Sequence, residues 1–255
     1  MVEIKTDAAL DAMREAGRVV AQALAAAREA AAVGVSLRDL DAAAHAVLDK
    51  AGATSPFLGY QPSFAPSPFP AVICASVNDA LVHGIPTDYR LRDGDLVSID
   101  CGAVLDGWAG DAAVSFIVGT PRPEDVELIA ATQRALDAGI AAAVVGHRLG
   151  DISHAVGAVA RTARCGMPTD FGGHGIGRQM HEDPHVPNRG RPGRGFPLRH
   201  GLVLAIEPML MSGGRDEYRT DPDGWTLRTV DGSRAAHIEH TVAITEQGPR
   251  VLTLV

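Results

Sequence analysis

The order of predicted elements occurs twice along this chain of 255 residues: two helices, a loop, and then a set of strands. In the first half, apolar residues spaced by three or four predict helices from residue 7 to Gly34 and from Ser36 to Gly52. Thr6 is expected to cap the first helix, and Ser36 with Asp39 forms a capping box for the second. A proline-rich loop over 55–70 and strands over 71–77, 96–104 and 112–118 are predicted to follow.

The second half repeats this order. Helices are predicted over 123–145 and from Asp151, as a cap, to about Arg164, and a loop rich in glycine and proline spans 166–197. Strands are predicted over 202–209, 225–229, 235–245 and 251–255. The repeat predicts one internally duplicated α+β domain over residues 1–255, with pseudo-two-fold halves of roughly 1–120 and 121–255. A functional site is expected where the halves meet.

Composition limits both the residues that can form the core and the possible functions of the chain. Hydrophobic residues make up 46% of the chain but aromatic residues only 4%, so alanine, valine and leucine must fill the core. The net charge of -8 argues against a nucleic acid substrate. The three cysteines lack metal-type spacing, which suits a reducing compartment. Because the sequence shows neither a signal region nor a run long enough to span a membrane, we expect a cytoplasmic protein without a membrane partner.

Two aspartates flank a predicted hairpin. Asp106-Gly107 is a strong two-residue turn, which would place Gly102 opposite Asp111. Strand alternation then puts Asp100 and Asp111 on one face as diagonal neighbours. Two carboxylates among apolar neighbours are costly unless a positive charge lies between them. The alternative is that one of them is a turn or edge aspartate in water.

A histidine lies among four glycines in the segment 171–178. Glycine there allows close backbone approach or a positive φ, either of which would position His174 as a ligand. His181 follows seven residues later and could hydrogen-bond a substrate. The alternative is a flexible loop with solvated histidines, and a phosphate-binding loop is weaker because no Rossmann or Gly-Lys-Ser/Thr context surrounds it.

Two glutamates interrupt apolar strands. Glu207 precedes Pro208, which removes a ladder donor and places Glu207 at an edge or strand end. Glu239 alternates with Ile238, so His237 shares its face while His240 points away. A buried salt bridge to an arginine is the alternative for either glutamate. Together with the aspartates and His174, however, these residues form an oxygen-rich set with one nitrogen, which suits two divalent ions such as manganese, iron, cobalt or zinc.

With these residues the chain resembles type I methionine aminopeptidase over nearly its whole length. Matching blocks are residues 78–86 (Asn-Asp-Ala-Leu-Val-His-Gly-Ile-Pro), the hairpin with both aspartates, Gly-His-Gly-Ile-Gly at 173–177, Ile-Glu-Pro-Met at 206–209 and Glu-His-Thr at 239–241. The resemblance implies the pita-bread fold around an antiparallel sheet. It also implies metal-dependent removal of the initiator methionine when the second residue is small, through a metal-bridging hydroxide.

The resemblance further implies roles for individual residues. Asp100 would chelate one ion and His174 with Glu207 the other, while Asp111 and Glu239 would bridge both. His83 would contact the substrate near the scissile amide, His181 would stabilise the oxyanion, and Glu207 would act as general base. The methionine pocket would be lined by Tyr60, Cys74, Met180 and Trp225. A monovalent cation, sodium or potassium, would bind the backbone around Asn78, Ala80 and Ala235.

Several features depart from the family pattern. The loop between Tyr60 and Cys74 is longer and richer in proline, and Gln61 stands where many members carry histidine. Met180 replaces an aromatic residue of the pocket. His237 stands where glutamine is common, which would change the surroundings of Glu239.

Two rival functions follow from the same fold. An Xaa-Pro aminopeptidase or creatinase-like enzyme would carry a separate N-terminal domain, whereas the first helix here is expected at residue 7. A non-catalytic binding module would have lost ligands, whereas all five are present. We therefore expect the N-termini of nascent polypeptides as substrates, a transient association with the ribosome, and a monomer.

Overall fold

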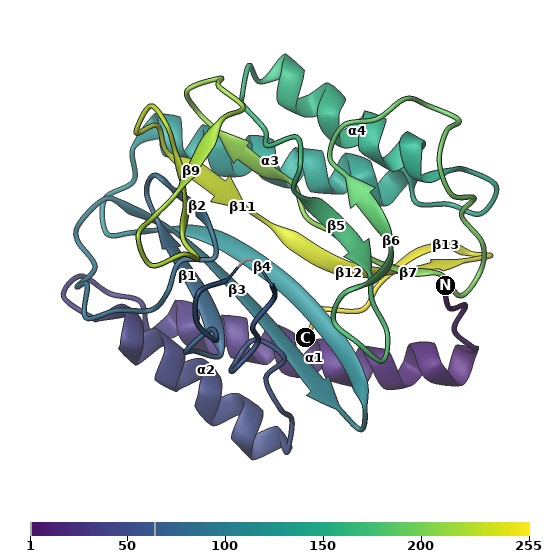
Figure 1. Cartoon of the computed structure of the whole chain (residues 1–255), viewed down its shortest axis with the longest axis horizontal. Coiled ribbons are helices and arrows are strands. Elements are labelled where there is room, and N and C mark those ends of the chain that lie inside the picture. Colours follow the sequence, from purple (N-terminus) through teal and green to yellow (C-terminus); the bar gives the residue numbers. More distant parts are fainter. Residues whose placement is uncertain (1, 64) are drawn as a thin grey trace.

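The computed structural model describes residues 2–63 and 65–255 as an α+β structure with a long antiparallel sheet and two pairs of helices (Figure 1). Phe64, within the loop predicted over 55–70, lies outside the described residues, as does Met1. The helices are α1 (Asp7–Ala30), α2 (Leu37–Ala51), α3 (Pro123–Ala142) and α4 (Leu149–Thr162). The strands are β1 (Ile73–Val77), β2 (Ala80–Val82), β3 (Asp95–Leu105), β4 (Trp108–Val118), β5 (Gly172–Gly175), β6 (Glu182–Pro187), β7 (Val203–Ile206), β8 (Met209–Met211), β9 (Tyr218–Thr220), β10 (Leu227–Thr229), β11 (Ala235–His237), β12 (Glu239–Thr245) and β13 (Gly248–Val251).

The main sheet joins the two halves of the chain. Its strand order is β1-β3-β4-β12-β7-β5-β6, with β13 also paired to β12. The first three strands come from the first half and the rest from the second, so the halves meet where β4 pairs with β12. Smaller sheets, β2-β10-β9 and β11-β8, lie beside it. The predicted α+β class and repeated order of helices and strands are confirmed, whereas the single domain over 1–255 stays a prediction.

Each helix pair covers strands of its own half. In Figure 1, α1 and α2 lie along β1, β3 and β4, and α3 and α4 lie at the opposite end of the view beside the second-half strands. Both predicted caps of the first pair are present: Thr6 Oγ1 accepts from Ala9 N at 3.3 Å, and Ser36 and Asp39 form the reciprocal box. Leu40 is fully buried in the core of this half, and burial of such a side chain contributes about 1.5–3 kcal/mol.

Several predicted helix boundaries were wrong. α1 ends at Ala30 rather than Gly34, since Val33 is 57% exposed and gives a further turn no packing. α3 ends at Ala142 rather than Val145, and α4 at Thr162 rather than Arg164. Asp151 is not the cap of α4. The helix begins two residues earlier, and Asp151 reaches back from its first turn to accept from Arg148 N at 2.7 Å.

The strand predictions also need correction. The segment 166–197 contains β5 and β6 rather than only loop. The prediction missed them because closely packed glycine backbone carries no strand-like side-chain pattern. The strands predicted over 202–209 and 235–245 are each interrupted, at residues 207–208 and at Ile238, and their ends lie in different sheets. The last predicted strand is wrong, since Val251 ends β13 and residues 252–255 form no strand. Strands β2 and β9 were not predicted.

None of the helices formed by the described residues is long and apolar enough to cross a membrane.

Candidate metal centre and adjoining pocket

The hairpin of β3 and β4 determines the positions of the first two carboxylates, Asp100 and Asp111. Asp106-Gly107 forms the predicted turn, with both residues at positive φ (49° and 75°). Gly102 therefore lies opposite Asp111, as predicted, and Asp100 lies on the same face one pleat away. Asp100 and Asp111 are diagonal neighbours in the middle of the molecule rather than at an edge.

The join between the halves adds Glu239. Ala113 of β4 lies opposite Asp100 of β3 on one side and opposite Glu239 of β12 on the other. Residues directly opposite each other share a face of a sheet, and so do residues two apart in one strand. Asp100, Asp111 and Glu239 therefore project from one face across three strands, with the small side chain of Ala113 between them.

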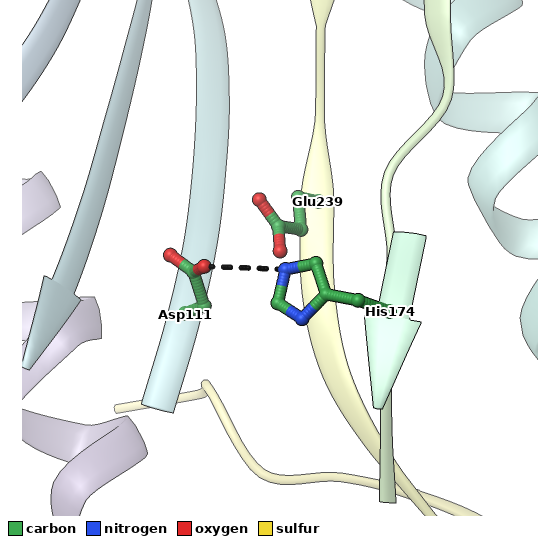
Figure 2. A group of neighbouring side chains, drawn as sticks. All are labelled: Asp111, His174 and Glu239. Atoms are coloured by element: carbon green, nitrogen blue, oxygen red, sulfur yellow. Dashed lines mark ion pairs between the residues drawn. The ribbon is translucent and has the colours of Figure 1, made fainter. Parts of the chain in front are cut away.

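The second half also supplies His174 and Glu207. His174 of β5 lies opposite Ala205 of β7, and Glu207 directly follows that strand. His174 Nε2 lies 3.6 Å from Glu207 Oε1 and 3.7 Å from Asp111 Oδ2, as Figure 2 shows for Asp111. The Nδ1 atom of His174 lies 2.9 Å from Gly175 O, and this contact orients Nε2 toward the carboxylates.

The glycines around His174 allow the backbone of β5 to pack closely against neighbouring backbone. A Cβ at Gly173 would overlap the carbonyl oxygen of Ala205, and one at Gly175 would overlap that of Asp183. Neither glycine has a positive φ. Of the two predicted reasons for glycine, close packing of β5 against its neighbours is the one observed, and His174 sits on a strand rather than in a flexible loop.

The cluster lacks a positive partner from the chain itself. Within residues 2–63 and 65–255, neither lysine nor arginine forms an ion pair with Asp100, Asp111, Glu207 or Glu239, so the salt-bridge alternative is wrong. Asp111 is only 4% exposed, so it is not an aspartate in water. Buried polar atoms that find no hydrogen-bond partner among the described residues include Asp100 Oδ1, Asp111 Oδ1 and Glu239 Oε1. Such atoms are costly unless a cation satisfies them.

The donor set fits divalent ions. Ligand atoms of Asp111, His174 and Glu239 all lie within 4.8 Å of one another, and so do those of Glu207, His237 and Glu239. Carboxylate oxygens with imidazole nitrogens suit ions of the manganese, iron, cobalt and zinc type. Two groups that share Glu239 agree with the prediction of two adjacent ions rather than one.

Burial dominates the protonation of the cluster. It raises the pKa of Glu207 to about 8 and, against the effect of His237, the pKa of Asp100 to about 7. Burial first, and then the neighbouring carboxylates, raise the pKa of Asp111 and of Glu239 well above the usual range. Burial lowers the pKa of His174 to about 3. Without a cation the carboxylates hold protons, with which a binding metal ion must compete.

The carboxylates form one wall of a cavity of about 310 Å³. All the residues predicted for the site from the sequence line this cavity: Tyr60, Cys74, His83, Asp100, Asp111, His174, Met180, His181, Glu207, Trp225 and Glu239. Gln61 is not among its lining residues, and its side-chain amide donates to Ala65 O within its own loop at 3.4 Å.

Aromatic side chains form another wall of the cavity. The Trp225 ring centroid lies 5.1 Å from that of Phe69 and 6.4 Å from that of Tyr60. Trp225 Nε1 donates to Ser67 O at 3.0 Å, which ties this ring to the proline-rich loop. Cys74 of β1 lies opposite Asp100 and so adjoins the carboxylates. The cavity therefore joins an apolar compartment directly to the polar cluster.

Two further histidines lie between these walls. The ring of His83 lies 5.8 Å from Phe171 and 6.5 Å from Trp225, and burial lowers the pKa of His83 to about 4. His181 lies in the turn between β5 and β6, with its ring centroid 4.5 Å from that of His174. Loss of surrounding water lowers the pKa of His181. Both imidazoles are neutral at pH 7 and can donate or accept one hydrogen bond.

Some lining residues were not found from the sequence: Phe57, Phe69, Asp170, Phe171, Gly172 and His185. Phe57 and Phe69 flank the proline-rich loop, where no periodicity relates a side chain to the site. Phe171 and Gly172 begin the glycine-rich segment, which was a usable signal. His237 was predicted to share the face of Glu239 and to alter its surroundings, and its Nε2 lies 3.8 Å from Glu239 Oε2.

Fold and site together define a hydrolase class, the pita-bread enzymes with a carboxylate-rich metal centre between two halves. Comparison with known proteins agrees. The family model described as metallopeptidase family M24 matches residues 11–246. A curated protein of Mycobacterium tuberculosis, "Methionine aminopeptidase 1", is 56% identical, over 96% of this chain and 92% of its own. A protein of the same name from Bacillus subtilis is 42% identical over the full length of both.

Solved structures give the same result. A methionine aminopeptidase from Thermotoga maritima superposes with a TM-score of 0.95, at 40% identity and complete coverage of both chains. A prolidase from Pyrococcus horikoshii has a TM-score of 0.74 at 23% identity, covers 98% of this chain and 63% of its own, and shows the fold alone. The chain belongs to metallopeptidase family M24 and, within it, to the methionine aminopeptidases.

Proposed function

We propose that this enzyme removes the N-terminal methionine from nascent polypeptides when the second residue is small. One observation carries the proposal: a single cavity places an aromatic compartment beside a cluster of unpaired carboxylates. The apolar compartment would hold the methionine side chain while the cluster holds the metal ions beside the scissile amide. Family membership supports this assignment, and the relatives named above carry the corresponding activity in their names.

We assign the two ions, cobalt, manganese, iron or zinc, to five residues. Asp100 would hold one ion and His174 with Glu207 the other, and Asp111 and Glu239 would contact both. The two ligand groups, one with Asp111 and His174 and the other with Glu207, both contain Glu239 and so support its contact with both ions. When bound, the ions would supply a hydroxide nucleophile and polarise the substrate carbonyl.

The remaining polar residues would handle protons and orientation. Glu207 would accept a proton from the nucleophile and pass it to the leaving amine. His181 would donate to the carbonyl oxygen as negative charge develops on it. His83, held between Phe171 and Trp225, would contact the substrate near the scissile nitrogen.

The methionine side chain would lie against Tyr60, Cys74, Met180 and Trp225, with Phe69 behind the indole. Sulfur–aromatic contacts and a flexible thioether wall suit an unbranched thioether substrate. We place the size limit for the second residue at the mouth of the cavity, where His181 and Tyr60 lie with ring centroids 5.7 Å apart.

The proposal includes the setting of the enzyme: a cytoplasmic monomer that meets nascent chains during a transient association with the ribosome. It also includes a monovalent cation, sodium or potassium, near Asn78. The backbone predicted for that site is brought together by a hydrogen bond from Ala235 N to Asn78 O at 2.9 Å. The neighbouring segment of β2, which includes Ala80, pairs with β10.

Peptide hydrolysis tests the proposal directly. The purified protein with added cobalt or manganese should release methionine from Met-Ala-Ser, and chelation should abolish this activity until metal is restored. Met-Leu-Ser tests the size limit and Lys-Ala-Ser tests the apolar compartment, and both should be poor substrates. Comparable rates on Met-Ala-Ser and Met-Leu-Ser would refute the size limit alone. Equal cleavage of Lys-Ala-Ser would refute the assignment of the aromatic wall to methionine.

A further inference from the structure

A second histidine lies in the carboxylate cluster. His237 is only 2% exposed, and its Nε2 atom is buried with no hydrogen-bond partner among the described residues. That atom lies 3.6 Å from Glu207 Oε2 and 3.8 Å from Glu239 Oε2. An unpartnered imidazole nitrogen in an apolar interior is costly, so its position between two carboxylates calls for a physical explanation.

His237 and His174 occupy equivalent positions relative to the carboxylates. His174 Nε2 lies 3.6 Å from Glu207 Oε1, and His237 Nε2 lies at the same distance from the other oxygen, Oε2. Each histidine belongs to a group of three possible ligands, and Glu239 belongs to both groups. The geometry that makes His174 a ligand is therefore present a second time, on the other side of Glu207.

The first half of the chain fixes the position of His237. Ser115 Oγ donates to His237 O at 2.8 Å, and His237 N donates to the same hydroxyl at 3.1 Å. Ser98, directly opposite Ser115 in the β3–β4 hairpin, lies 2.8 Å from it through the two hydroxyls. The strands that carry Asp100 and Asp111 thus also hold the backbone of His237 at a fixed place relative to the cluster.

We propose that His237 Nε2 is a direct ligand of one of the two ions, together with Glu207 and Glu239. This inference rests on the proposed two-metal centre. The ion held by His174 and Glu207 would then have five protein ligands. Neighbouring ligand atoms about 2.0–2.1 Å from such an ion lie roughly 3 Å apart, so the separations of 3.6 and 3.8 Å need shifts of less than an ångström. Two imidazoles rather than one favour cobalt, iron and zinc over manganese, which prefers oxygen ligands.

The alternative role is positioning, in which His237 only hydrogen-bonds Glu207 or Glu239. His237→Gln separates the two roles, because glutamine keeps a hydrogen-bond donor but replaces the imidazole nitrogen with amide groups. A direct ligand predicts that His237→Gln weakens cobalt binding at one of the two sites by about 10-fold or more and manganese binding by less. A positioning role predicts equal effects on both metals. His185→Gln, which removes a histidine of the same cavity outside both ligand groups, is the matched control and should leave both affinities unchanged.

Proton NMR of the cobalt-loaded protein counts coordinated imidazoles without measuring activity. Two strongly shifted, solvent-exchangeable imidazole N–H resonances are expected in the wild type, one of which disappears in His237→Gln and neither in His185→Gln. A single such resonance in a protein that binds two cobalt ions would overturn the role of His237 and leave the metal centre standing. Failure to bind cobalt at all would overturn both. The wild-type count decides the question even if His237→Gln does not fold.

Discussion

Two clusters of acidic side chains in this protein are neutralised in different ways. Near β2 and β10, Arg228 pairs through Nη1 with Asp79 Oδ1 at 2.6 Å and through Nε with Asp221 Oδ2 at 2.5 Å. In the cavity, the carboxylates of the candidate metal centre are more deeply buried, yet the described chain offers them only neutral histidines. The chain thus supplies its own cation to the half-exposed cluster and none to the buried one.

The difference suggests a criterion for telling structural carboxylates from those that await a cation. A carboxylate with an arginine is complete in the folded chain, and its loss should affect stability rather than chemistry. A buried carboxylate oxygen with neither a lysine or arginine partner nor a hydrogen-bond donor reduces stability until an external cation binds. Acidic content alone therefore says little about metal binding. What sets the cavity carboxylates apart is that Asp100, Asp111 and Glu239 each have a buried oxygen without either kind of partner among the described residues.

The largest expected effect comes from Asp111→Ala. If Asp111 contacts both ions, its loss should lower both bound metal and kcat/KM well beyond the roughly 10–100-fold that loss of an outer partner costs. Asp221→Ala removes a carboxylate from the arginine-paired cluster and should leave both quantities within a few-fold of the wild type. Metal analysis and peptide hydrolysis on the same preparations measure both effects. Full activity in Asp111→Ala would refute the two-metal proposal.

His181→Ala should have the next largest effect, and it separates metal binding from catalysis. A donor to the developing oxyanion acts mainly in the transition state, so kcat should fall by about 10²–10³ while KM changes little. Bound metal should stay at the wild-type level, whereas His174→Ala should lose it. An unchanged kcat, or a fall explained wholly by lost metal, would remove His181 from the proposed mechanism.

The pH dependence of the stability of the metal-free protein tests whether the buried carboxylates lack a cationic partner. Burial raises the pKa of Glu207 to about 8 and of Asp100 to about 7, so the folded state binds more protons than the unfolded state below these values. The free energy of unfolding should therefore fall as pH rises. Burial lowers the pKa of several histidines, His83 and His174 among them, below the unfolded value of 6.5, which gives the opposite slope around and below that pH. The carboxylates should outweigh the histidines between about pH 7 and 8.

Urea unfolding across that window measures the effect, which should amount to a few kcal/mol. With saturating manganese the slope should flatten, because metal-bound carboxylates are deprotonated in the folded state just as they are in the unfolded state. A metal-free protein whose stability rises from about pH 7 to 8 would show that the buried carboxylates are already neutralised, and the contrast between the two clusters would be lost.

The polar half of the site could be predicted from sequence because turn type and side-chain alternation determine where strand residues lie. The Asp106-Gly107 turn fixes the register of its hairpin, and alternation then brings Asp100 and Asp111 to one face. Glu207 was correctly placed at a strand end by the proline after it. The repeated order of elements predicted a site where the halves meet, but neither the pairing of β4 with β12 nor that of Ala113 with Glu239.

The apolar half could not be derived in this way. Phe57 and Phe69 lie at the ends of a proline-rich loop, where backbone angles follow no period that relates a side chain to a cavity. Tyr60, Met180 and Trp225 were placed at the pocket only through the family resemblance. Alternation correctly placed His237 on the face of Glu239, but its contact with Glu207 was not predicted, because it depends on the interruption at Ile238 between strands of two different sheets.

The smallest expected effect concerns the paired cluster itself. Asp221 is 17% exposed and accepts from Arg228 and also from Arg219 Nη1 at 2.6 Å. Asp221→Asn removes the charge from both bonds while Arg228 keeps Asp79, so the free energy of unfolding should fall by roughly 1–2 kcal/mol, between the values for exposed and buried charged hydrogen bonds.

Asp11→Asn is the matched control for Asp221→Asn. Its pair with Arg250 lies at 2.9 Å, but Asp11 is 70% exposed, so the loss should stay within about 0.5 kcal/mol. Urea unfolding with saturating metal measures both variants, and 1 M salt should shrink the difference between them only partly, since the Asp221 pairs are the less accessible to screening ions. Equal losses in the two variants would mean that the pair with Arg228 stabilises the Asp221 carboxylate no more than solvation by water does. The unpaired carboxylates of the cavity would then no longer stand apart from the acids elsewhere in the chain.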